Sequence, residues 1–230
     1  MKIRIKFKKY NVLRFIGHLD LMRYFQKLMR RASVPVAYSA GFSPHMIMSF
    51  AQPLGIGIIS DAEYLDVNLQ QEVDLQDLTS RLNEFNVDGL EIISITEIPE
   101  GKKYSGMANV AAADYACYVS TKALRLTWDQ LSEKLQQFMD QEQILIQKKT
   151  KRSDAVVDIR PMIYSLKADS EGCIVMSLAQ GSVENLKPSL VMEAILGYLG
   201  VDGSDVKVQI KRTELYAKVD DAYIGLDELK

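Results

Sequence analysis

The sequence predicts an α+β fold made of two tandem ferredoxin-like halves, each with βαββαβ order and an antiparallel sheet. Segments that alternate apolar and polar residues indicate strands, and segments with apolar residues at helical spacing indicate helices. The same order of elements then recurs beyond residue 110. At 230 residues the chain is also long enough for two domains of ordinary size.

The first predicted domain spans residues 1–100. Its first strand is marked by Ile3, Ile5 and Phe7, which alternate with bases, and its second helix by Asp74, a good N-cap residue. The full predicted order is a strand over 2–8, a helix over 18–32, strands over 46–51 and 63–69, a helix from 74, and a strand over 90–98. Because the first strand lies beside the third in this topology, Arg4 and Lys6 are expected to pair with Asp66.

The second predicted domain spans residues 111–216, after a Gly/Pro-containing junction near 99–112. Thr127 with Gln130 forms a capping-box pattern that starts one helix, and Pro188 starts another that Gly200 ends. The predicted strands are 115–121, 143–149, 155–166, 172–179 and 206–210. This is one strand more than the first half has. Residues 217–230 are expected to form an acidic, poorly fixed tail.

Charge is distributed unevenly along the chain. Residues 1–31 contain ten Lys or Arg and one acid, residues 32–60 contain no formal charge, and residues 61–100 contain eleven acids and one base. The net charge of −2 conceals this pattern. Such a distribution concerns binding partners more than fold, and the basic segment indicates a polyanion.

Several basic residues are candidates for contacts with RNA phosphates. Helical spacing places four of them on one exposed stripe, and a second cluster follows residue 147. A solvated helix face would show the same pattern without any ligand. The predicted phosphate contacts are Arg14, Arg23, Lys27, Arg30, Arg31, Lys148, Lys149, Lys151 and Arg152.

The chain contains only two histidines, His18 and His45, and both are candidates for the specific part of a nucleic-acid site. His18 lies at a predicted helix N-terminus, and His45 follows a loop with Tyr38 and Phe42, which could stack on bases. We expect His18, Asp20 and His45 to converge on one pocket. Asp20 would then cap the helix or orient an imidazole, and capping is the better supported role.

Many marked classes of site are missing from the sequence. It has no CxxxCxxC for an iron–sulfur cluster, no GxxxxGK[ST] or GxGxxG for nucleotides, no GxSxG nucleophile elbow and no zinc-ligand spacing. We therefore predict no metal and no cofactor. Glycines and prolines interrupt the uncharged segment 32–60, so no membrane span is expected, and two cysteines fit a reducing cytoplasm.

The segment GHLDLMRYFQKLMRRASVPVAYSAGFSPH at 17–45 resembles the radical-SAM-linked protein family. The resemblance continues through MSFAQPL at 48–54, EYLD at 63–66 and VDIRP at 157–161. In that family the domain occurs alone or joined to cobalamin-type radical SAM enzymes. The resemblance implies a cytoplasmic bacterial accessory protein with a radical SAM enzyme as its partner. Arg160, within the last motif, joins the predicted nucleic-acid contacts.

These observations predict an accessory protein that binds RNA or positions a substrate for a radical SAM enzyme. Two alternatives remain open. The protein could be a metal-independent endoribonuclease in which His18 or His45 is the general base. It could also be an interaction module that docks on a basic partner through an acidic 61–100 surface. The sequence does not decide whether the protein is an enzyme.

Overall fold

The structure is a computed structural model that describes residues 1–149, 154–169 and 172–229. It is a mixed α/β fold with a large, mostly antiparallel sheet and, within those residues, six helices. The chain divides into two compact units, one formed by Met1–Ala111 with Arg212–Lys230 and the other by Ala112–Lys211. None of the helices in the described part of the chain is long and apolar enough to cross a membrane.

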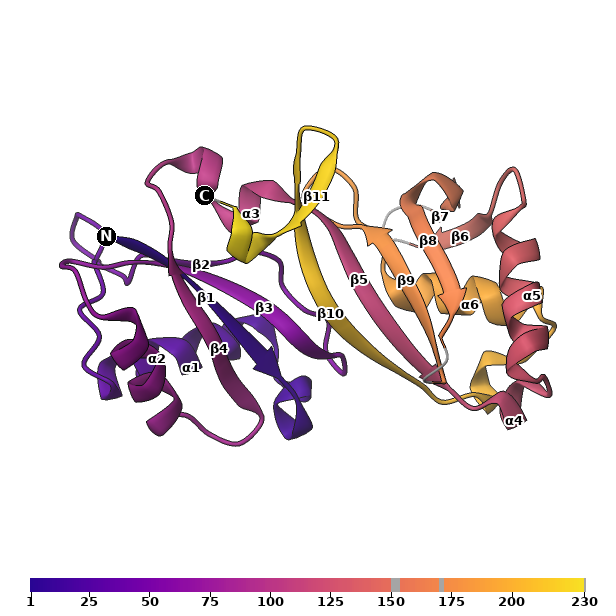
Figure 1. Ribbon diagram of the computed structural model, residues 1–230, viewed down its shortest axis with the longest axis horizontal. Coiled ribbons are helices and arrows are strands. Elements are labelled where there is room, and N and C mark those ends of the chain that lie inside the picture. The colour runs from indigo at the N-terminus through magenta and orange to yellow at the C-terminus, as the bar shows by residue number, and fades with distance from the viewer. Residues whose placement is uncertain (150–153, 170–171, 230) are drawn as a thin grey trace. The chain divides into compact units, whose positions relative to one another are not determined.

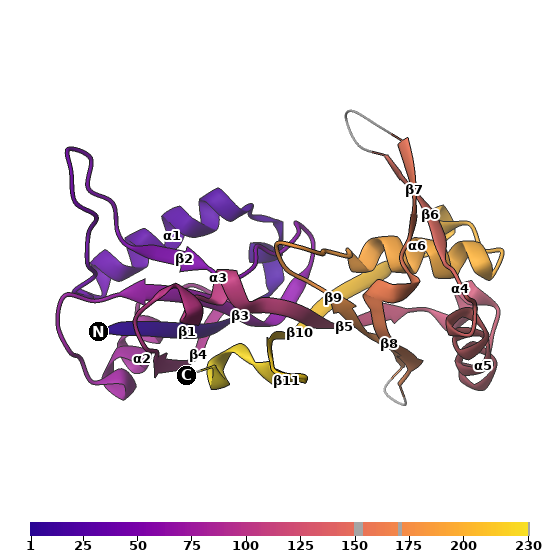
Figure 2. The same cartoon turned by 90° about the horizontal axis from the view of Figure 1, so that it is seen from above.

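The first unit contains strands from both ends of the chain (Figures 1 and 2). Four of its strands have the order β4-β1-β3-β2, and β1 is antiparallel to both of its neighbours. The elements of this unit are β1 (Lys2–Lys9), α1 (His18–Arg31), β2 (Met48–Phe50), β3 (Ile59–Asn68), α2 (Leu75–Glu84), β4 (Leu90–Glu97), α3 (Gly106–Asn109), most of β10 (Val208–Val219), and β11 (Ala222–Gly225).

The predicted pairing of the first and third strands is confirmed. Ile3 lies opposite Val67, and Ile5 lies opposite Leu65. Ile3, Ile5 and Phe7 of β1 are completely buried in one core with the apolar sides of α1 and α2. The alternation of the sequence thus places every second residue of β1, including Arg4 and Lys6, on the opposite face of the sheet.

That opposite face is covered, so Arg4 is buried. Arg4 Nε donates to Asp66 Oδ1 at 2.7 Å and Nη2 donates to Asp66 Oδ2 at 3.0 Å, which confirms the predicted pair. Nη2 also donates to the Tyr104 carbonyl and Nη1 donates to the Leu226 carbonyl, each at 2.6 Å. The Gly106 amide also donates to Asp66, and a Cβ on Gly106 would lie 2.9 Å from that of Ala51. Any larger residue at position 106 would therefore have to displace Ala51.

Lys6 pairs with different acids from the one predicted. Its Nζ lies 2.7 Å from Glu214 and 3.1 Å from Asp227, and the Tyr64 hydroxyl donates to both of these carboxylates. Burial by itself would lower the pKa of Lys6, but the two carboxylates raise it above its usual value. Burial and the same carboxylates raise the pKa of Tyr64, so its hydroxyl stays protonated and donates.

A second buried ion pair joins β3 to β10. Arg212 donates through Nε to Glu63 at 2.9 Å and through Nη2 to the Gln52 carbonyl at 2.9 Å. Lys9 is also buried, and its Nζ donates to the Ile16 carbonyl at 3.4 Å. Burial lowers the pKa of Lys9, and this outweighs the opposing effect of Glu63.

The segment predicted as an acidic tail, 217–230, is instead structured over its described residues 217–229. Strand β10 continues through Val219, pairs with β11, and is followed by a 3₁₀ turn over Leu226–Glu228. Leu226 and Leu229 are buried, and Asp227 binds Lys6. The prediction was wrong because acidic composition was taken as solvation, whereas Asp227 pairs with Lys6 of β1 and two leucines of the segment are buried.

The second unit has strand order β5-β9-β8, with β9 antiparallel to both neighbours, and a separate β6-β7 hairpin. This extra hairpin breaks the predicted repeat, so tandem ferredoxin-like halves are not confirmed. The predicted 155–166 strand is divided by a 3₁₀ turn that contains Pro161. The elements are β5 (Val110–Val119), α4 (Thr121–Leu124), α5 (Trp128–Met139), β6 (Leu145–Lys149), β7 (Asp154–Asp158), β8 (Ile163–Ala168), β9 (Cys173–Ala179) and α6 (Pro188–Tyr198).

The helix boundaries predicted for this unit are confirmed. Thr127 and Gln130 form the reciprocal capping box of α5. Pro188 is the first residue of α6, and Gly200 beyond its end has a φ of +68°, a conformation that favours glycine.

We predict that Arg4→Met destabilises the protein by about 3–5 kcal/mol, because Asp66 keeps its charge in a buried site without its partner. Denaturant unfolding measures this loss. Lys8→Gln is the control, since Lys8 pairs with Glu91 at 3.5 Å in a half-exposed position, and its loss should cost at most about 1 kcal/mol. Equal effects of the two substitutions would contradict the assigned role of Arg4.

Lys9→Met should change the unfolding free energy by less than about 1.5 kcal/mol, because an apolar side chain of similar volume suits this buried position. The lowered pKa of Lys9 means that the unfolded chain binds its proton more readily, so Lys9 makes stability rise as pH increases from the folded-state pKa toward 10.5. The variant should lose that rise when unfolding is measured across this pH range. A rise that persists in Lys9→Met would show that another group causes it.

Candidate nucleic-acid interface

The predicted stripe of bases lies on the exposed side of α1. We call Arg23, Lys27, Arg30 and Arg31 the cationic stripe, and all four are exposed. The side chains of Lys27 and Arg30 form no ion pair or hydrogen bond with any described residue. The Arg31 guanidinium lies 6.0 Å from the centroid of the Tyr24 ring. The stripe therefore presents positive charge that the described part of the chain leaves largely uncompensated.

Asp20 has a different role from those predicted. Its carboxylate accepts a hydrogen bond from Arg23 Nη1 at 3.2 Å, and no side chain caps α1 at Gly17. Both partners are largely exposed, at 70% for Arg23 and 65% for Asp20, so the pair is weak. An incoming anion can displace Asp20 from Arg23 at low cost.

A hairpin-like arm, residues 36–47, follows α1. Val36 and Tyr38 form bridges with Leu69 and Met46, and the Ala37 amide donates to the Asn68 carbonyl at 2.8 Å. Phe42 near the tip is fully exposed, next to Gly41, whose φ is +107°. Figure 2 shows the arm projecting beside the C-terminal end of α1. The arm thus presents a fully exposed aromatic side chain on the side of the unit where α1 ends.

The two histidines lie in different surroundings. The His18 ring packs edge-on against Phe50, with the ring centroids 5.2 Å apart. His45 Nδ1 lies 2.9 Å from the Ser39 hydroxyl, which also accepts from the His45 backbone amide at 3.1 Å. His45 lines a cavity whose lining contains neither His18 nor Asp20. The pocket predicted to unite the three residues is not found there.

The other predicted contacts are scattered. The Arg14 guanidinium lies over the Phe15 ring, 4.7 Å from its centroid. Arg160 Nε donates to the Met139 carbonyl at 2.8 Å, so Arg160 satisfies the last turn of α5. Lys148 and Lys149 lie on β6, but their side chains, like Lys151 and Arg152, are outside the described residues.

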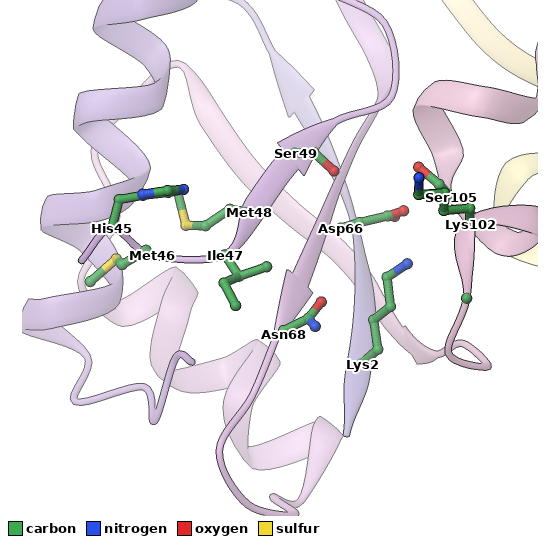
Figure 3. A pocket seen from close by; sticks show the side chains of 11 residues that line it. Lys2, His45, Met46, Ile47, Met48, Ser49, Asp66, Asn68, Lys102 and Ser105 are labelled. Atoms are coloured by element: carbon green, nitrogen blue, oxygen red, sulfur yellow. The ribbon is translucent and has the colours of Figure 1, made fainter. Parts of the chain in front are cut away.

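A cavity of about 400 Å³, which no sequence pattern predicted, lies on the charged face of the first unit's sheet (Figure 3). Lys2 and Asp66 point from the strands toward the segment that carries Lys102 and Ser105. Its complete lining is Lys2, His45, Met46, Ile47, Met48, Ser49, Asp66, Asn68, Gly101, Lys102 and Ser105. Lys2 and Lys102 are a hundred residues apart in sequence, so no local pattern could have joined them.

The cavity carries an excess of positive charge. The Asp66 carboxylate is already matched by Arg4 and the Gly106 amide, which leaves Lys2 and Lys102 without an ion-pair partner among the described residues. The side chains of Ser49, Asn68 and Ser105 likewise form no hydrogen bond within the described part of the chain. Several donors therefore face the cavity with unused capacity.

Several acids of the segment 61–100 are buried or paired, so the segment does not form the continuous acidic surface that its composition indicates. Glu63 and Asp66 are buried in ion pairs, and Asp74 accepts from two backbone amides as the N-cap of α2. Asp88 binds Asn11, and Glu91 binds Lys8. Among the described residues, no group of three or more His, Cys, Asp or Glu side chains could hold a metal ion.

Comparisons with known proteins add little to this geometry. A family model described as "Uncharacterized protein conserved in bacteria (DUF2344)" matches residues 2–188. No curated protein matches the chain. Among solved structures, a putative dyp-type peroxidase protein from Shewanella oneidensis is 9% identical, with a TM-score of 0.20, over 99% of this chain and 93% of that chain. That similarity is too low to support an inference about fold or activity.

Proposed function

We propose that this chain, which belongs to the bacterial family DUF2344, is an accessory protein that binds single-stranded RNA. The observation that carries the proposal is the cationic stripe, where Lys27 and Arg30 are exposed and have no partner among the described residues. Phosphates that bind such cations release counterions, and this gain accumulates with each contact.

The arm supports single strands over duplexes. Phe42 is fully exposed on a projecting tip, and Tyr38 near its base is 43% exposed. An apolar ring kept in water is unfavourable unless something covers it, and every unpaired base offers a flat face for stacking. The stripe would hold the backbone while the arm stacks on bases beside it.

The proposed partner rests only on the family resemblance, which is carried mainly by residues 17–45. That resemblance indicates a cytoplasmic protein that works with a radical SAM enzyme. The strand order β4-β1-β3-β2, with α1 and α2 packed on one face of the sheet, further supports a ferredoxin-like fold for the first unit. A binding role fits the site better than a nuclease role, because His45 is bound to Ser39 and lines a cavity without His18.

Replacing both unpaired cations should weaken RNA binding in a salt-dependent way. We expect Lys27→Gln with Arg30→Gln to flatten the log–log salt dependence of affinity by about 1.4, since each phosphate contact on a single strand contributes about 0.7. Fluorescence anisotropy with a labelled oligouridylate across a salt series measures this slope. The control removes two exposed lysines of the second unit, Lys122→Gln with Lys134→Gln, and should leave the slope unchanged. Equal slopes for wild type and the α1 variant would exclude the stripe as the contact.

Phe42→Ala should act on a different property of binding. Loss of one stacked base costs about 1–3 kcal/mol, so affinity should fall roughly 5- to 150-fold, while the salt slope stays the same. The melting temperature should not change, because the side chain is fully exposed. Phe42→Trp is the matched variant and should keep the affinity. An unchanged affinity in Phe42→Ala would remove the arm from the proposed interface.

A further inference from the structure

We propose that the cavity lined by Lys2, Lys102 and His45 is a binding site for a phosphate monoester. The site is separate from the cationic stripe, because Lys2, Asp66 and Asn68 lie on the sheet face opposite α1. Its volume of about 400 Å³ falls within the range of small-molecule sites, so a phosphate group with an attached nucleoside fits the available space.

The charge of the cavity requires an anion. Asp66 would repel one, but Arg4 holds both of its carboxylate oxygens, at 2.7 and 3.0 Å, and neutralises it. Lys2 and Lys102 then remain as two uncompensated cations that approach the cavity from different segments of the chain. A dianion is the ligand charge that balances them.

The donor chemistry favours phosphate over carboxylate. A carboxylate is best held by the planar fork of an arginine, and no arginine lines the cavity. Arg4, which pairs with the lining residue Asp66, also donates to two backbone carbonyls. The cavity instead offers two compact ammonium groups, together with the side chains of Ser49, Asn68 and Ser105. These point donors suit the three terminal oxygens of a phosphate monoester.

One apolar side chain at the cavity suits the organic part of the ligand. Ile47 is 37% exposed and lies beside Asn68, whereas Met46 and Met48 belong to the core on the other face of the sheet (Figure 3). An aliphatic side chain packs against a flat ring without demanding specific donors. Two sources of the ligand share this chemistry, namely a free nucleotide and the 5′-phosphorylated end of an RNA strand.

Calorimetric titration with uridine 5′-monophosphate tests the site directly, and uridine is the matched ligand without the phosphate. We expect the nucleotide to bind wild type and Lys27→Gln/Arg30→Gln equally, and uridine not to bind. Lys102→Gln should weaken the nucleotide by about tenfold, as loss of a charge-assisted contact predicts. Lys103→Gln is the control, because Lys103 is the next residue of the same loop and does not line the cavity.

A second comparison separates the two sources. If the site serves RNA ends, a 5′-phosphorylated oligouridylate should bind more tightly than its 5′-hydroxyl form, and Lys102→Gln should abolish the difference. If only the free nucleotide shows the Lys102 effect, the site serves a small molecule. No nucleotide binding at about 10 mM, ten times a millimolar Kd, together with equal affinities for the two RNA forms, would overturn the proposal while leaving the cationic stripe untouched.

Discussion

The buried pair of Arg4 and Asp66 is the interaction on which the rest of the first unit depends. A guanidinium on the face of a sheet cannot be buried unless each of its nitrogens finds an acceptor, because an unpaired buried charge costs several kcal/mol. Asp66 supplies two acceptors, and the carbonyls of Tyr104 and Leu226 supply the others. Burial of one charge therefore determines where two distant segments of the chain must lie.

The need to pair buried charges also explains why both ends of the chain lie in this unit. The N-terminal strand brings Arg4, Lys6 and Lys9, and the C-terminal strands return Arg212, Glu214 and Asp227 to that sheet. Arg4, Lys6 and Arg212 each meet at least one carboxylate at ion-pair distance. Lys9 is the exception, and burial lowers its pKa. The part of β1 that carries Arg4 and Lys6 is thus covered by acids and is not an open cationic surface.

Because most cations of β1 are paired within the protein, the cations of the first unit that have no acidic partner among the described residues indicate where an anion could bind. Lys27 and Arg30 on α1, and Lys2 and Lys102 at the cavity, have no acidic partner within the described chain. The two pairs lie on opposite faces of one sheet, and the arm at its β2 edge contributes Phe42 outward and His45 to the cavity. A strand of RNA on α1 and a phosphate in the cavity would use different residues of the same small unit.

Local patterns were sufficient for much of the secondary structure. The alternation in β1, the Asp74 cap, the Thr127 capping box and the Pro188 and Gly200 signals act within a few residues, so the sequence by itself determined these elements. The exposed stripe of α1 followed in the same way from helical spacing. Only the tertiary structure decided which charges were buried, because burial of Arg4 depends on residues 62 and 222 positions away. For the same reason it decided that the acidic end is a strand and that Lys2 and Lys102 share a cavity.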